Sequence, residues 1–143
     1  MRSTGLIDSP PHDPLSGARA RGAALKRDLL ERAGGALTVE EVAVVLGVSP
    51  NAVHARHDRG TLFAVRDGTG KGLYPACQFD NEGSLPGLDL VLAAFTVEGA
   101  WTRLSVLLSP APAIGGATPL DLLRRGDVAG AVEAVSSYGE HGG

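Results

Sequence analysis

Cysteine is almost absent from this sequence, which has one, Cys77, among 143 residues. A single cysteine cannot form a disulfide within the chain, and it leaves no second thiol for a metal–thiolate cluster. We therefore expect Cys77 to be a small buried side chain and not a reactive thiol. His54 and His57 lie three residues apart, but no cysteine or further histidine is near them, so we expect neither a metal site nor a cofactor.

Long apolar runs are also missing. No stretch approaches the roughly 20 apolar residues that are needed to span a bilayer. Residues Met1–Ser16 have too few apolar side chains for a signal peptide. We therefore expect a cytoplasmic protein that does not act on membranes.

The usual signatures of catalysis are absent as well. The sequence has no glycine-rich loop that leads a strand into a helix, and no pair of carboxylates stands out. The one thiol has no obvious activating histidine, while His54, His57 and Asp58 are too close in the chain to form a triad by themselves. We predict that the protein is not an enzyme. A chain of 143 residues holds one or two small domains that act mainly through their surfaces.

Positive charge is scarce overall but unevenly distributed. The net charge is −3, with six Lys/Arg against four Asp/Glu in residues 1–36, four against four in 37–79, and three against eight in 80–143. A nucleic-acid surface therefore belongs in the middle of the chain or in the N-terminal arm. The acidic last third is expected to face something else.

Proline, glycine and apolar periodicity divide the chain into four parts. Residues 1–16 read as a flexible, proline-rich leader, and residues 17–36 as an N-terminal helix that ends at Gly34-Gly35. Residues 37–79 are predicted to form a winged helix-turn-helix, and residues 80–143 a helical C-terminal domain. The expected fold is therefore mainly α, with one small β-hairpin.

The pattern from Leu37 to Gly60 is typical of a helix-turn-helix. Thr38 and Glu41 form a predicted capping box, and Gly47 ends the first helix. Ser49-Pro50 starts the second helix, because serine caps well and proline fits the first helical position. Val53 is expected to anchor this helix on the core, which leaves its other face free for a DNA major groove.

The predicted DNA contacts lie on the second helix and on the hairpin that follows it. Leu62–Val65 and Gly72–Gln78 are the expected strands, and Pro75 should restrict the second strand to a sheet edge. This hairpin resembles the wing of MerR-like and excisionase-like domains. Asparagine reads adenine edges, whereas serine, arginine and lysine suit phosphates. The predicted contact residues are Ser49, Asn51, His54, Ala55, Arg56, Arg66 and Lys71.

Five later segments, in their order, resemble the Xre/MbcA/ParS antitoxin family. They are YPACQF (74–79), LPGL (85–88), Trp101 with Leu107–Pro110, GGATPLDLLRRGDV (115–128) and YGEHGG (138–143). The resemblance covers the chain from about Leu37 onward. It implies an antitoxin that binds and neutralises a RES-domain toxin, an enzyme that consumes NAD, and that represses its own operon by binding operator DNA.

The resemblance also implies a toxin-binding surface in the last 26 residues. Thr118 and Pro119 read independently as a helix start. The alternative for Leu120, Leu122 and Leu123 is that they close the domain's own core, where we expect Leu122 or Leu123, and also Trp101. The exposed arginines and the tail are the better contacts. The implied toxin contacts are Thr118, Pro119, Leu120, Leu123, Arg124, Arg125, Tyr138, Gly139, Glu140 and His141.

Two further expectations remain. One helix-turn-helix with little positive charge offers few contacts, so we expect a homodimer on a palindromic operator, formed through the N-terminal helix or the C-terminal domain. The alternative function is a stand-alone helix-turn-helix regulator, or an excisionase-like protein, in which the last third serves only for dimerisation.

Overall fold

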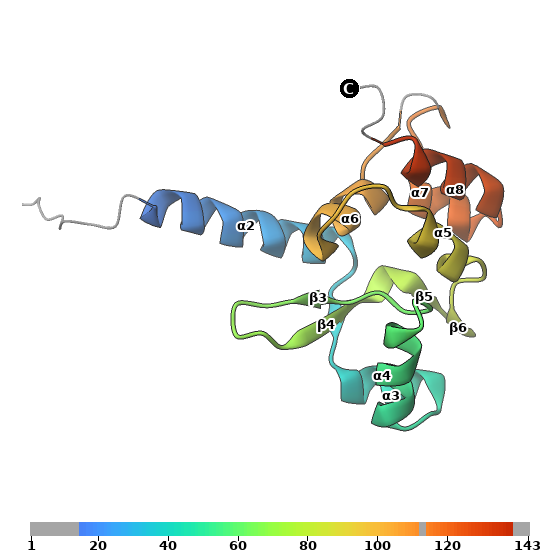
Figure 1. Cartoon of the computed structure of the whole chain (residues 1–143), viewed down its shortest axis with the longest axis horizontal. Helices are drawn as coiled ribbons and strands as arrows, with labels where there is room; N and C mark the ends of the chain where they lie inside the picture. Colours follow the sequence, from blue (N-terminus) through green and yellow to red (C-terminus); the bar gives the residue numbers. More distant parts are fainter. Residues whose placement is uncertain (1–14, 112–113, 139–143) are drawn as a thin grey trace, which may run out of the picture.

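A computed structural model describes residues 15–111 and 114–138 (Figure 1). The predicted leader therefore lies outside the described residues except for Leu15 and Ser16. The first element is helix α2, Ser16–Arg32, which projects from the rest of the molecule. Of its side chains only Leu29 is buried. Helix α2 thus joins the core through its last turns alone, and the rest of the helix stands in solvent.

The helix-turn-helix forms as the sequence predicts. Helix α3 covers Val39–Leu46, and Thr38 and Glu41 close a complete capping box at its start. Gly47 adopts a left-handed conformation with φ of 69°, which glycine tolerates without strain. Helix α4 covers Pro50–Asp58, and the Ser49 hydroxyl accepts a hydrogen bond from the Ala52 N–H at 3.1 Å.

A three-stranded antiparallel sheet follows, in the order β2-β4-β3. Strand β2 is Ala36–Leu37, β3 is Val65–Arg66 and β4 is Gly72–Pro75. We refer to β3, β4 and the loop between them, Val65–Pro75, as the wing. The expected hairpin is therefore present, but both of its strands are shorter than predicted, and residues 76–78 form the 3₁₀-helix η1 (Ala76–Gln78).

The expectation that Pro75 restricts its strand to a sheet edge is wrong, because β4 is the central strand. Pro75 is opposite Ala36, and the neighbouring Ala76 N–H donates to Gly35. Hydrogen-bonding residues alternate sides along an antiparallel strand, so the side on which Pro75 lacks a donor faces β3. The ladder with β3 has already ended there, at Val65 opposite Leu73. The missing N–H therefore costs no ladder bond.

The sheet lies between two hydrophobic cores. Successive side chains of β4 point to opposite faces: Tyr74 belongs to the core of the helix-turn-helix with Val42 and Val53, whereas Leu73 packs on a larger helical core. A second short hairpin, β5 (Phe79–Asp80) with β6 (Gly83–Ser84), leads to the C-terminal helices. Strands β2, β5 and β6 were not predicted from the sequence.

Four helices complete the larger core. They are α5 (Leu88–Ala94), α6 (Ala100–Leu107), α7 (Pro119–Arg124) and α8 (Val128–Ser136). Helix α8 packs on both α5 and α7. The fold is mainly α-helical with a small antiparallel sheet, as expected. None of the helices in the described ranges is long and apolar enough to cross a membrane.

Candidate nucleic-acid interface

The exposed side of α4 carries the predicted reading residues. Asn51 and His54 are exposed, Ala55 and Arg56 are half-buried, and Val53 on the opposite side is completely buried. Ser49 is exposed at the cap, where its hydroxyl accepts one hydrogen bond and keeps its own proton to donate. Helix α4 is therefore fixed to the core by one face while its N-terminal turn stays accessible.

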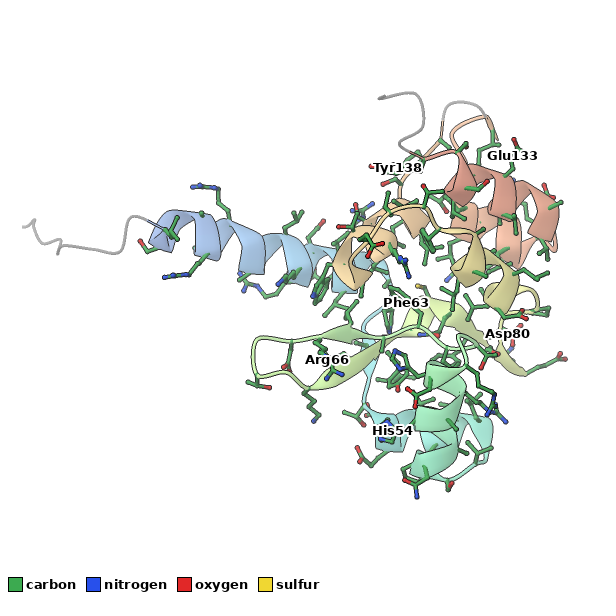
Figure 2. All side chains as sticks on the ribbon, viewed as in Figure 1. His54, Phe63, Arg66, Asp80, Glu133 and Tyr138 are labelled. Atoms are coloured by element: carbon green, nitrogen blue, oxygen red, sulfur yellow. The ribbon has the colours of Figure 1, made fainter. Side chains whose placement is uncertain are left out.

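The wing brings two cations close to this helix. His54 of α4, Arg66 of β3 and Lys71 beside β4 line one hollow of about 290 Å³, together with Glu40 at the start of α3. Figure 2 shows His54 and Arg66 on the same side of the molecule, one on the helix-turn-helix and the other on the wing. The arrangement places an exposed helix face beside two cationic side chains.

The loop at the wing tip is held by Asp67. Its Oδ1 accepts hydrogen bonds from the Thr69 hydroxyl at 2.6 Å, the Thr69 N–H at 2.8 Å and the Lys71 N–H at 3.0 Å. The Thr69 hydroxyl and then the Lys71 and Thr69 amides lower the pKa of Asp67, because each bond favours the charged carboxylate. Across the same loop, Arg66 Nη1 donates to the Gly70 carbonyl at 2.8 Å. These bonds give the wing one defined shape.

Trp101 anchors the wing to the C-terminal helices. The indole N–H donates to the Arg66 carbonyl at 3.1 Å, and the Trp101 ring packs on the helical core. The expectation of a core tryptophan is therefore only half right, since Trp101 is half-buried with its N–H on the wing. A tryptophan on a helix surface usually places its N–H on a polar partner, but 35 residues separate this pair, so the sequence did not reveal it.

The described His57 and Cys77 contact neighbouring side chains of the core region. His57 meets the Tyr74 ring edge-on, at 6.1 Å between ring centroids, and its Nδ1 lies 3.7 Å from Asp58. Burial raises the pKa of the Cys77 thiol to about 11, so the thiol stays protonated near neutral pH. Within the described ranges no group of three or more His, Cys, Asp or Glu side chains is placed to hold a metal ion.

The residues implied as toxin contacts divide into two groups. Pro119, Leu120 and Leu123 are buried in the chain's own core, so the assignment of their side chains to a partner surface is wrong. They are buried because α7 turns its apolar face toward α6 and α8. Thr118 is half-buried, and its hydroxyl accepts from the Asp121 N–H in a capping box.

The second group is accessible. Arg124 and Arg125 are exposed at the end of α7, and Tyr138 is exposed just after α8. The Tyr138 carbonyl accepts a hydrogen bond from the Thr96 hydroxyl at 3.2 Å, which fixes the end of the described chain beside the α5–α6 connection. Gly139, Glu140 and His141 lie outside the described residues.

The fold and the surface define a winged helix-turn-helix joined to a helical C-terminal domain. A similar solved structure is the NMR structure of Rv2175c, with a TM-score of 0.61 and 22% sequence identity. The similarity covers 71% of this chain and 79% of that one, and it concerns the fold alone. No protein-family model and no curated protein matches the sequence. The antitoxin resemblance therefore stays a prediction.

Proposed function

We propose that this chain is a sequence-specific DNA-binding regulator. The observation that carries the proposal is the shared hollow of His54, Arg66 and Lys71, which places the exposed face of α4 beside the cations of the wing. An α-helix fits the major groove of B-DNA, and a basic hairpin next to it suits the flanking phosphates. The acidic remainder of the chain is then turned away from the DNA.

Each residue has a distinct role in this proposal. Asn51 reads an adenine edge, and His54 and Ala55 contact the groove beside it. Ser49, at the helix N-terminus, binds a phosphate through its free hydroxyl proton, with the Asn51 N–H beside it, since the Ala52 N–H is already bonded to the Ser49 hydroxyl. Arg56 reaches the backbone with its long side chain. Arg66 and Lys71 neutralise phosphates next to the groove, and Asp67 keeps them in position.

A selected DNA site separates these roles. A random library yields the preferred sequence, after which the dissociation constant is measured against salt concentration. Arg66→Ala with Lys71→Ala should reduce the log–log salt slope by about 0.9 for each lost phosphate contact. Asn51→Ala should relax the base preference at one position, at a cost of roughly 1–3 kcal/mol. Arg124→Ala with Arg125→Ala, which removes the same charge elsewhere, should leave both unchanged.

The proposal includes a homodimer on a palindromic site. One copy supplies one reading helix and few cations, so two copies about one helical turn of DNA apart are needed for tight binding. Light scattering of the free protein at tens of micromolar, and a titration of the selected site, give the stoichiometry. A monomer that binds DNA one to one contradicts this part. Unchanged affinity, salt slope and base preference in both the Asn51→Ala variant and the Arg66→Ala/Lys71→Ala double variant contradict DNA binding by this surface.

We also propose that the C-terminal region binds a protein partner, and that the partner is a RES-domain toxin. The sequence resemblance supports the toxin, and the accessible Arg124, Arg125 and Tyr138 support a contact at the ends of α7 and α8. The chain itself then acts by binding and not by catalysis. A stand-alone regulator is the rival, and a RES-domain gene beside this one distinguishes the two.

The toxin proposal has its own experiment. Arg124→Glu with Arg125→Glu, and separately removal of residues 138–143, should restore NAD loss in cells that express the cognate toxin. Both variants should still bind the selected DNA site with nearly unchanged affinity. If both still protect cells and still co-purify with the toxin, the contact surface lies elsewhere.

A further inference from the structure

The exposed part of α2 is strongly basic. Between Ser16 and Arg27 the helix carries Arg19, Arg21, Lys26 and Arg27, and no Asp or Glu. All four side chains are exposed, and the helix joins the core only near Leu29. A short helix is only marginally stable by itself in water. The packing of α2 near Leu29 therefore does not explain why about three turns of basic helix extend beyond the core.

One face of this helix is tied to the wing. The Lys26 ammonium lies over the Trp101 ring, 5.3 Å from its centroid, and the Trp101 N–H donates to the Arg66 carbonyl. Trp101 therefore lies between α2 and β3. Helix α2 and the wing extend from the body in the same direction (Figure 1), away from the C-terminal helices.

Helical periodicity sorts the four cations. Arg19 precedes Lys26 by seven residues, about two turns, so both lie on the face that is turned toward Trp101 and the wing. Arg27 flanks this face, about 100° from Lys26, whereas Arg21 lies about 140° away on the other side. The wing-side face of α2 thus carries Arg19 and Lys26, with Arg27 at its edge.

From this placement we infer that α2 is a second phosphate-binding element, which holds the DNA backbone beyond the segment contacted by the wing. The inference rests on the proposed DNA-binding function and extends its surface to an element outside the helix-turn-helix. With α2, the side of the molecule that carries Arg66 and Lys71 gains several cations, although the whole chain has a net charge of −3. Lys/Arg contacts to phosphate supply most of the sequence-independent affinity of DNA-binding proteins.

A second copy of α2 fits this helix less well. Leu25 on α2 and Leu15 just before it are exposed, at 61% and 57%, and a pair of such helices would bury them against each other. Side-by-side pairing, however, also brings together five cations of each copy against only Asp28 and Glu31, so each α2 carries a net charge of +3. The phosphates of a DNA backbone neutralise these charges instead.

The test compares two faces of the same helix. Arg19→Gln with Arg27→Gln alters the wing side and its edge, and Arg21→Gln is the control on the far side, to be compared with Arg27→Gln alone; glutamine preserves helix propensity. On the selected DNA site, the double variant should reduce the salt slope by about 1.8 and lose backbone protection at one flank only. The central footprint and the mass by light scattering should stay as in the wild-type protein. The control should change the slope by less than about 0.5.

The outcomes separate this inference from the proposed function. If the wild-type protein selects no DNA at all, the proposed function is wrong, and the role of α2 in binding DNA is wrong as well. If the wild-type protein binds but the double variant keeps its slope and its full footprint, only the role of α2 is wrong. Two other outcomes also contradict the role of α2. If Arg21→Gln and Arg27→Gln alone change the salt slope equally, the effect is general electrostatics. If the double variant has a lower oligomeric mass, α2 acts in self-association.

Discussion

The side-chain amide of Gln78 takes the place of a strand opposite Phe63. Gln78 Oε1 accepts from the Phe63 N–H at 2.8 Å, and Gln78 Nε2 donates to the Phe63 carbonyl at 2.7 Å. The same Nε2 donates to the Pro75 carbonyl at 3.0 Å. Gln78 is the one polar or charged residue that is buried in the described chain. It satisfies the backbone groups left open where the β3–β4 ladder ends, and it does so between the two cores.

Replacing this amide should therefore be costly. Gln78→Leu has nearly the same size but leaves one buried N–H and two buried carbonyls with no partner from this side chain. Each buried group left unsatisfied costs about 1–3 kcal/mol, so we expect the free energy of unfolding to fall by several kcal/mol in urea denaturation. Asn81→Leu, at an exposed position, is the control. A loss below about 1 kcal/mol for Gln78→Leu contradicts this role.

Gly87 allows α5 to approach α8. Its φ is 86°, and a Cβ built there lies 2.5 Å from Val128 Cγ2. Gly87→Ala should therefore destabilise the protein by roughly 1–3 kcal/mol, from the left-handed backbone and from the clash with Val128. In a Val128→Ala background the same change should cost less, because the clash is then relieved. Equal costs in the two backgrounds would show that the backbone conformation alone is responsible.

Short local patterns in the sequence were enough to predict where α3, α4 and α7 begin. The capping box at Thr38, the serine cap with its proline at Ser49-Pro50 and the threonine cap with its proline at Thr118-Pro119 predict helix starts that the structure confirms. These signals act over three or four residues, so a single sequence contains them. They also placed Asn51 and His54 correctly on an exposed helix face.

Contacts between residues that lie far apart in the chain could not be predicted from local sequence patterns. The wing strand was predicted to begin at Leu62, but the Phe63 backbone is bonded to Gln78, 15 residues away, and pairing starts only at Val65. Strand β2 is two residues long and exists only through β4. The leucines of α7 have one apolar face that suits a core and a partner equally, and only the packed structure decides between them.

Leu123 distinguishes a core role from a partner contact. Its side chain is 2% exposed, so Leu123→Ala should lower the free energy of unfolding by roughly 2–5 kcal/mol, through lost burial and the cavity left behind. Arg124→Ala, the next residue along the exposed side of α7, should change stability by less than about 0.5 kcal/mol. Thermal and urea unfolding of the two variants provide the comparison. A nearly neutral Leu123→Ala would restore this residue to the candidate partner surface.

The wing should lose its shape on acidification, in a direction set by Asp67. Hydrogen bonds from Thr69 and Lys71 lower the pKa of Asp67 below its ordinary value of 3.8. A carboxylate with a lowered folded pKa stabilises the folded loop above its unfolded pKa, and this contribution is lost as the pH falls through the folded pKa. The Thr69 and Lys71 amide resonances should therefore titrate together below pH 3.8, while the amides at the end of α6, a helix without carboxylates, stay unchanged over the same range.

Asp67→Ala is the matching change at neutral pH. It removes all three acceptor bonds, so the Thr69 and Lys71 amides should exchange faster and DNA affinity should fall, although the variant gains a unit of positive charge. That combination separates the two effects of the carboxylate. If Asp67 acted only as a negative charge near the phosphates, Asp67→Ala would bind DNA more tightly. Tighter binding together with unchanged amide exchange would show that the loop bonds do not position Arg66 and Lys71.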